Sequence, residues 1–351
     1  MGGRLLSHWD LPEKRISRQE FSQIEKEVVG MLYAVLPPET RIKPLLFFGD
    51  KQDFGDMNIL VEIPTGTITE SPHPWRGKKS MDWKLLIETT FGYKPFHNGD
   101  VYSFPFDGFQ VDLILASPEI YDCAYNYYAY ESGNIQGRVA RRLGLKYGHK
   151  GLYLNIPLNY FSPELPDHHF REILVTRDSE KIFAMLGFSW WDFRQGFFVA
   201  EDMFGWVARS SYFDPKIFAF EELDHQTRTR NRKRPVYHKF LEYCAKFSGD
   251  PTTAWYLPSV ESVRNEIIRT FPHIAIEIEK ARGEILLNAE RKAKWNGKIV
   301  QELLGLEKED LGAFMKSFLL EPRGDFEDFN AWLDSKTSEE VKEEILKHGN
   351  H

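Results

Sequence analysis

Cysteine is scarce in this chain of 351 residues: Cys123 and Cys244 are the two present, without a CxxC pair or a Cys/His cluster. This scarcity argues against a disulfide framework and a structural zinc site, and it favours a reducing compartment. No apolar run approaches the ~18 residues of a membrane-spanning helix, and Asp10 interrupts the N-terminal segment before an apolar signal core develops. We therefore expect a cytoplasmic protein without a membrane partner.

Four widespread catalytic motifs are also missing: GxGxxG, Walker A, HExxH and GxSxG. Their absence removes the commonest dinucleotide-binding, P-loop, zinc-protease and serine-hydrolase classes. Basic residues are in the minority, because 45 Lys and Arg stand against 52 Asp and Glu, a formal net charge of -7. A polycationic chain is thereby excluded, and any nucleic-acid site must be local.

The residues that are present describe a folded soluble protein. Hydrophobic residues make up 42% and charged residues 28% of the chain, close to the average of globular domains. At ~150 residues per domain the length predicts roughly two domains. We expect an α+β fold, with a head of small mixed sheet and helices over residues 1–160 and a mainly helical region over residues 161–351.

In the head, short strands should alternate with helices. A capping box over Ser17–Glu20 opens a helix that Pro37 ends. Short strands are predicted over residues 43–48, 57–63, 101–106, 109–115 and 152–156. Asp107–Gly108 is the turn of a hairpin between the third and fourth of these strands. Further helices are predicted over residues 80–91, 117–130 and 134–143, with Ser80 and Ser117 as N-caps and Gly133 ending the second.

Beyond residue 157 the pattern becomes mainly helical. A short strand is expected over residues 172–176. Helices are expected over residues 179–186, 199–210, 235–247, 259–270, 274–304, 309–320, 325–334 and 338–347.

Three polar residues on two of the predicted strands are candidates for chemistry. Alternation places Asp56 and Asn58 on one face of their strand, and Asp112 is a lone carboxylate within an apolar strand. Burying a carboxylate is costly unless a metal or a donor compensates it. If the two strands are neighbours, the three side chains converge. Oxygen ligands beside a glycine-containing turn suit a Mg²⁺-triphosphate, since Mg²⁺ prefers oxygen and the N–H groups of the turn can hold phosphate.

These residues resemble the signature of the polymerase β-like nucleotidyltransferases, which is a Gly-Ser turn, a downstream Asp-x-Asp strand and a third Asp on a later strand. The matching text is FFGD at 47–50, DFGDMNILVE at 53–62 and FQVDLI at 109–114. It is most similar to a divergent viral and fungal branch. The resemblance implies that Asp56, Asn58 and Asp112 are catalytic and hold Mg²⁺ or Mn²⁺, and that Gly49, Asp50 and Lys51 form the triphosphate turn.

Two positions depart from the family pattern. The family serine is replaced by Asp50, which would repel a phosphate unless a metal bridges them, and the second carboxylate is replaced by Asn58, which keeps a carbonyl ligand but loses a charge. The family uses two metal ions about 3.5–4 Å apart. The remaining carboxylates would hold one ion better than two, with Asp50 or Asp53 as alternatives for the missing ligand. An inert domain of the same fold is the competing interpretation, and so is a polar turn with a strand Asp paired with an Arg.

Two basic segments follow these motifs. Arg138, Arg141 and Arg142 share one face of a helix, which suits a triphosphate or a primer backbone, or else a solvated helix face. The second segment has no acidic residue and predicts a nucleic-acid-binding strip, with a solvated loop as the alternative. Its basic residues are Arg228, Arg230, Arg232, Lys233, Arg234 and Lys239.

Residues 296–315 resemble the helical tail of CCA-adding enzymes and bacterial poly(A) polymerases, with a plain helical hairpin as the alternative. Together the resemblances imply a metal-dependent nucleotidyltransferase that moves a nucleoside monophosphate from an NTP to an acceptor hydroxyl. An RNA 3′ end, tRNA-like, is the first acceptor to consider. The alternatives are a catalytically inactive nucleic-acid-binding module and a relative that transfers the nucleotide to a protein hydroxyl.

Overall fold

The computed structural model describes residues 4–63, 81–247, 258–320 and 326–349. The chain divides into two compact units, the first made of Met1–Asn155 and Leu174–Thr270 and the second of Ile156–Ile173 and Phe271–His351. The expected α+β class is confirmed: mixed sheets with helices come first, and the chain is mainly helical from about residue 179 to 349. The expected boundary at residue 160 lies within a segment of the second unit.

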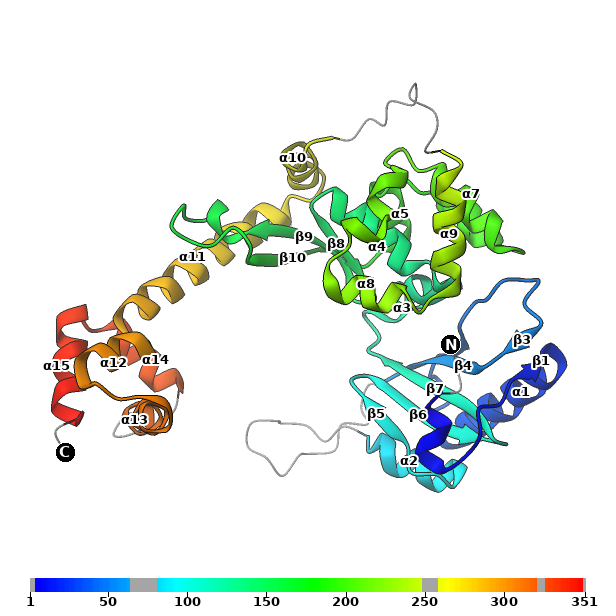
Figure 1. The fold of residues 1–351 in the computed structure, drawn as a ribbon, viewed down its shortest axis with the longest axis horizontal. Helices are drawn as coiled ribbons and strands as arrows, with labels where there is room; N and C mark the ends of the chain where they lie inside the picture. The colour runs from blue at the N-terminus through cyan, green and yellow to red at the C-terminus, as the bar shows by residue number, and fades with distance from the viewer. Residues whose placement is uncertain (1–3, 64–80, 248–257, 321–325, 350–351) are drawn as a thin grey trace. The chain divides into compact units, whose positions relative to one another are not determined.

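A five-stranded sheet organises the first unit (Figure 1). In spatial order its strands are β2 (Ile42–Pro44), β4 (Asp56–Glu62), β7 (Phe109–Ala116), β6 (Val101–Phe106) and β5 (Phe96–Asn98). β4 and β7 run parallel, and the other neighbouring pairs are antiparallel. The predicted hairpin is confirmed: β6 and β7 meet at Asp107–Gly108, and both turn residues have the positive φ that this two-residue turn requires.

Helices cover the two faces of this sheet differently. α1 (Arg18–Val35) and α2 (Trp83–Phe91) pack on the face that carries Met57, Ile59 and Val61 of β4. On the opposite face α3 (Tyr121–Tyr128) packs on Leu60 and Ile114. The polar residues that β4 and β7 contribute to this second face precede the two residues that α3 covers.

Two predicted elements of the head have different ends. α1 begins as expected, because Ser17 and Glu20 form a complete capping box. The strand expected over 43–48 ends at Pro44, so this prediction is wrong for residues 45–48. Leu45 N–H still donates to the Asn58 carbonyl of β4 at 2.9 Å, but the next residue bonds outside the sheet, where the carbonyl of Leu46 accepts the N–H of Tyr130 at 2.9 Å.

Helix starts in the head also differ from expectation. Ser80 lies outside the described residues, and the Asp82 side chain caps α2. The helix expected from Ser117 begins only at α3, without a side-chain cap, because residues 117–120 first form a turn. Gly133 does not end a helix but begins α4 (Gly133–Arg142). A Cβ there would lie 2.3 Å from the Tyr127 carbonyl oxygen, so the close approach of α3 and α4 requires glycine.

The rest of the first unit is mainly helical around an aromatic core. Its further helices are α5 (Ser179–Met185), α6 (Trp190–Gln195), α7 (Ala200–Ala208), α8 (His225–Asn231), α9 (Pro235–Ala245) and α10 (Val260–Thr270), with the 3₁₀ helices η2 (Ala129–Glu131), η4 (Pro215–Phe218) and η5 (Phe220–Glu222). Phe183, Phe193 and Trp206 are buried, and their rings contact one another. α6, of 6 residues, and α8, of 7 residues, were not predicted.

Two smaller sheets accompany these helices. One pairs β1 (Ile16–Ser17) with β3 (Asp53–Phe54), and the other has the order β10 (Phe170–Thr176), β9 (Gly151–Pro157), β8 (Leu145–Gly148). The strands expected over 152–156 and 172–176 are therefore confirmed, as parts of β9 and β10.

The second unit contains the helices η3 (Leu158–Tyr160), α11 (His273–Lys294), α12 (Gly297–Leu304), α13 (Lys308–Leu320), α14 (Phe326–Asp334) and α15 (Ser338–Gly349). The C-terminal helices of this unit enclose a small apolar core. Val300, Phe318 and Phe329 lie in that core. The single helix expected over 274–304 is wrong, because Asn296 leaves the helical conformation and its side chain caps α12. Across the described ranges no helix combines the length and apolarity needed to span a bilayer.

Candidate functional site

Parallel pairing of β4 with β7 brings the three candidate residues onto one face of the sheet. Asn58 lies directly opposite Asp112 in the register, and Asp56 lies opposite Gln110. Side chains at paired positions of neighbouring strands project to the same face. The two strands are thus neighbours, as the predicted convergence of Asp56, Asn58 and Asp112 required.

Asp112 is an almost fully buried carboxylate with protein donors around it. The Gln110 Nε2 group donates to Asp112 Oδ1 at 2.9 Å and to Oδ2 at 3.0 Å. Ser103, opposite Asp112 on β6, donates a further hydrogen bond. Burial raises the pKa of Asp112 from 3.8 to about 6, and the nearby Asp56 charge acts in the same direction, while the bonds from Ser103 and Gln110 oppose this rise.

Asp56 and Asn58 are more accessible than Asp112. Both are part-exposed, and the Asn58 Nδ2 group donates to Asp56 Oδ2 at 3.3 Å. In this orientation the amide nitrogen of Asn58, and not its oxygen, faces the Asp56 carboxylate. The site therefore offers two carboxylates and one amide oxygen from adjacent strands.

This donor set fits one Mg²⁺ ion. Mg²⁺ is held in proteins by one or two carboxylates and completes its six ligands with water or phosphate oxygen. A third carboxylate is missing: within the described ranges no three His, Cys, Asp or Glu residues form a metal-binding group. Of the two alternatives considered for that ligand, Asp53 instead pairs with Arg15 at 2.6 Å, and Asp50 is exposed on the turn that precedes β3.

Sequence reasoning missed the residues that surround Asp112. Gln110 is two positions earlier on the same strand face, and the hairpin register sets Ser103 opposite. The positions of Gln110 and Ser103 next to Asp112 follow from strand alternation and from the hairpin turn at Asp107–Gly108, so the sequence contained the information needed to predict them. The 3₁₀ helix η1 (Arg4–Trp9), whose Leu5 N–H donates to Gln110 Oε1 at 3.1 Å, had no sequence signal.

At the turn predicted to hold phosphate, the backbone N–H groups bond within the protein. Gly49 N–H donates to the Phe197 carbonyl at 3.2 Å, and Asp50 N–H donates to the Phe198 carbonyl at 2.9 Å. Lys51 N–H closes the turn itself, and the Lys51 ammonium lies 4.9 Å from the centre of the Phe54 ring. In this arrangement a phosphate would meet side chains rather than an open set of N–H groups.

Gly49→Ala should destabilise the first unit by about 1–3 kcal/mol, the usual cost of overpacking. A Cβ at this position would lie 2.4 Å from Phe198 Cδ2 and 3.2 Å from Phe198 Cα, so the bridge to residues 197 and 198 must shift. The matched control is Gly30→Ala in α1, where a Cβ meets nothing within 4 Å and should stabilise the helix by roughly 0.5–1 kcal/mol. Hydrogen exchange of the β4 and α1 amides measures the stability of both variants. Equal protection in Gly49→Ala and Gly30→Ala would contradict the close contact between residue 49 and Phe198.

Two of the three predicted phosphate-binding arginines of α4 have partners inside the protein. Arg138 donates to the carbonyls of Ile217 at 2.8 Å and Glu222 at 3.1 Å, and burial lowers its pKa. Arg141 forms an ion pair with Asp224 at 2.7 Å. These contacts hold α4 against the segment that precedes α8.

The α4 arginines nevertheless border an open cleft of about 550 Å³. Its lining is mixed in charge and is made of Arg138, Arg141, Arg142, Asp214, Lys216, Ile217, Glu222, Asp224 and Val260. Hydrogen bonds from Thr227 and the pairing with Arg141 lower the pKa of Asp224 to about 2, so this carboxylate is charged near neutral pH. Arg142 is exposed. The carboxylates weaken the cleft as a phosphate site, since they repel an anion.

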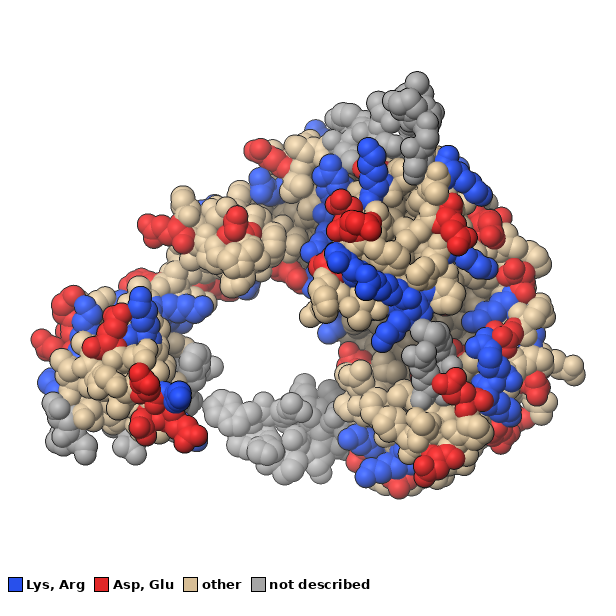
Figure 2. Space-filling model, in the orientation of Figure 1, with Lys and Arg blue, Asp and Glu red and all other residues tan. Residues whose placement is uncertain are grey.

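The second basic segment forms the C-terminal part of α8 and the start of α9. Arg228 donates to the Leu223 carbonyl at 2.8 Å, and burial lowers the pKa of Arg234. The other four basic residues of the strip are exposed: Arg230, Arg232, Lys233 and Lys239. Figure 2 shows Lys and Arg side chains gathered over the region of α8. The exposed members are therefore the part of the predicted strip that can meet a phosphate backbone.

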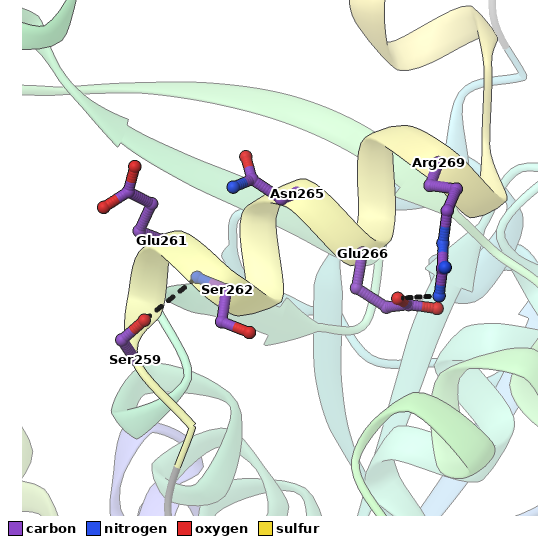
Figure 3. A pocket seen from close by; sticks show the side chains of 6 residues that line it. All are labelled: Ser259, Glu261, Ser262, Asn265, Glu266 and Arg269. Carbon is purple, nitrogen blue, oxygen red and sulfur yellow. Dashed lines mark hydrogen bonds and ion pairs between the residues drawn. The ribbon is translucent and has the colours of Figure 1, made fainter.

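A further pocket, of about 470 Å³, follows α10 and has a different character. Figure 3 shows its six lining residues along this one helix: Ser259, Glu261, Ser262, Asn265, Glu266 and Arg269. Ser259 Oγ accepts the Ser262 N–H at 3.1 Å, and Arg269 pairs with Glu266. The pocket lies along one exposed helix and does not bring together side chains from different elements, as the face of β4 and β7 does.

Neither a protein-family model nor a curated protein matches this chain. Function has to be argued from the site itself, because fold class alone does not define a reaction.

Proposed function

We propose that this chain is a polymerase β-like, metal-dependent nucleotidyltransferase that moves a nucleoside monophosphate from an NTP to an acceptor hydroxyl. The observation that carries the proposal is the parallel register of β4 and β7, which sets Asn58 opposite Asp112 with Asp56 two residues earlier on the same face. Oxygen ligands converging on a sheet face that α3 leaves partly uncovered are the donor set for Mg²⁺ or Mn²⁺.

In this reaction the acceptor hydroxyl releases its proton to solvent as its oxygen bonds to the α-phosphorus, the bond from the α-phosphorus to the oxygen shared with the β-phosphate breaks, and pyrophosphate leaves with that oxygen. A bound Mg²⁺ would supply charge stabilisation to the phosphates. Asp56 and Asp112 would hold the ion, with the Asn58 oxygen as the third protein ligand. The Lys51 side chain, on the turn that precedes β4, would neutralise phosphate charge.

An RNA 3′ end is the acceptor that we favour. The exposed members of the basic strip, Arg230, Arg232, Lys233 and Lys239, support this choice, because a local cluster of cations on an acidic protein suits a polyanion. A protein hydroxyl is the alternative acceptor for the same chemistry.

A specific observation favours a second candidate function, a catalytically inactive nucleic-acid-binding module. The N–H groups of Gly49 and Asp50, which an active relative would turn towards phosphate, bond to the carbonyls of Phe197 and Phe198. Asn58 also lacks the charge of the carboxylate that the family pattern has at this position. Both features are expected of a nucleotidyltransferase-like site that has lost its activity.

Calorimetry with each of the four NTPs, with Mg²⁺ or Mn²⁺, separates the two candidates. We expect metal-dependent binding of at least one NTP by the wild type, weakened on the order of 100-fold or more in Asp112→Ala, with label from that NTP appearing in total RNA. Gly30→Ala serves as the folded control, since it lies in α1, away from the site. Absence of metal-dependent NTP binding, with RNA still bound through the strip, would establish the inactive module.

A further inference from the structure

The 3₁₀ helix η1 lies against the sheet strands that carry Asp112. Its Leu6 side chain is fully buried, and the Trp9 indole N–H donates to the Lys94 carbonyl at 3.0 Å. The His8 ring stacks on Phe96 of β5 with ring centres 4.8 Å apart. Through the register, Phe96 shares a face with Ser103, and Ser103 shares it with Asp112. η1 is thus anchored beside the candidate site, on the same face of the sheet.

One backbone donor of η1 reaches the Gln110 side chain. Leu5 N–H donates to Gln110 Oε1 at 3.1 Å, and the Nε2 group of the same amide donates to both oxygens of Asp112. An amide can turn by 180° about its last bond and exchange its oxygen with its nitrogen. With the Leu5 N–H on one side, only one orientation pairs a donor with an acceptor at both ends, because the turned amide would set its oxygen against the carboxylate.

We infer that Gln110 is a positioning residue for Asp112 and that the Leu5 N–H of η1 fixes its orientation, so that the N-terminal 3₁₀ helix controls how tightly the site holds a divalent cation. This inference rests on the proposed function for its metal. Each carboxylate oxygen has two lone pairs, so the bonds from Gln110 leave capacity on Asp112 for a metal while they fix its rotamer. Partners of this kind typically change metal affinity 10–100-fold.

Leu5→Pro removes the single N–H at issue. Proline is tolerated at the first turn of a helix, where the N–H has no partner within the helix. Leu5→Ala is the matched control, because it removes the side chain and keeps the N–H. Gln110→Met removes the amide at similar volume and tests the same link without a change in η1.

Binding of Mn²⁺ alone to the full chain, followed by the spin-resonance signal of the free ion, measures the effect. We expect Leu5→Pro and Gln110→Met each to weaken binding on the order of 10-fold, and Leu5→Ala to stay near the wild type. The double variant Leu5→Pro/Gln110→Met should lose the same factor of about 10 and not the product of about 100, because both changes break one link. Equal affinity of Leu5→Pro and Leu5→Ala, or additive losses in the double variant, would overturn the inference and leave the proposed function standing.

A wild type that binds no Mn²⁺ sensitive to Asp112→Ala would overturn the proposed function instead. That result would also remove the control of metal affinity from the inference, and the remaining part, that the Leu5 N–H fixes the orientation of Gln110, is then decided by the side-chain amide protons of Gln110, assigned from their disappearance in Gln110→Met. If these protons exchange slowly in the wild type and in Leu5→Ala but rapidly in Leu5→Pro, the result supports the hydrogen bond from the Leu5 N–H as the contact that orients Gln110. Unchanged exchange in Leu5→Pro overturns it.

Discussion

Relative to the wild type, the Asp112→Asn variant should gain stability as the pH rises from acid to neutral. Burial raises the pKa of Asp112 from 3.8 to about 6, so the folded chain ionises this carboxyl less readily than the unfolded chain. Well below pH 3.8 the carboxyl is protonated in both states, and this ionisation penalty is absent. As the pH rises from about 3.8 to about 6 the unfolded chain ionises the carboxyl while the folded chain keeps it protonated, so about 3 kcal/mol of stability is lost, since one pKa unit corresponds to about 1.4 kcal/mol. Above pH 6 the loss is complete. The Asp112→Asn variant has no such titration.

Hydrogen exchange of the β4 and β7 amides at pH 4 and pH 7, with metal removed by a chelator, measures this difference. The free energy of opening in Asp112→Asn relative to wild type should rise by up to about 3 kcal/mol between the two pH values. Asn58→Ala is the control, because it removes the opposite amide and leaves both carboxylates in place. A difference between Asp112→Asn and wild type that is the same at both pH values would show that burial of Asp112 is not costly.

The candidate face was predictable because strand alternation and one hairpin turn determine it. Asp107–Gly108 sets the register of β6 on β7, and alternation then orders Gln110, Asp112 and Ser103. That β4 lies beside β7 is a long-range pairing that periodicity does not predict, so the convergence of Asp56 and Asn58 with Asp112 could be stated only on the condition that the two strands are neighbours. The bonds from Gly49 and Asp50 to residues 197 and 198 were beyond prediction, since they join segments about 150 residues apart and leave no local pattern.

Charge runs were a weaker guide than strand patterns. Arg138 and Arg141 share a helix face, yet one bonds to carbonyls and the other to Asp224. Spacing along a helix shows which side chains are neighbours but not what they meet across the fold. The partners of these two arginines, Ile217, Glu222 and Asp224, lie in the segment between α7 and α9. The sequence pattern did not predict the structure of that segment, including α8.

Asn58→Asp should tighten the binding of a divalent cation at the proposed site. The added carboxylate would lie opposite Asp112 and two residues from Asp56, which restores the charge that the family pattern has and this chain lacks. Because affinity for divalent cations rises with the number of charged ligands, we expect Mn²⁺ binding to strengthen on the order of 10-fold or more. Without metal the third negative charge should destabilise the sheet, since like charges at close range repel. If the proposed transfer reaction is limited by ligand charge, nucleotide transfer should rise together with metal affinity.

The charge-swapped variant, Asn58→Asp combined with Asp112→Asn, separates the amount of charge from its position. It keeps the net charge of the wild type and moves one carboxylate from the buried strand β7 to the part-exposed end of β4. Affinity close to that of the wild type would show that charge count controls binding, whereas loss of binding would show that the buried position of Asp112 is essential. A single Asn58→Asp variant with neither higher Mn²⁺ affinity nor lower metal-free stability would contradict the convergence of these side chains and, with it, the site on which the proposed reaction depends.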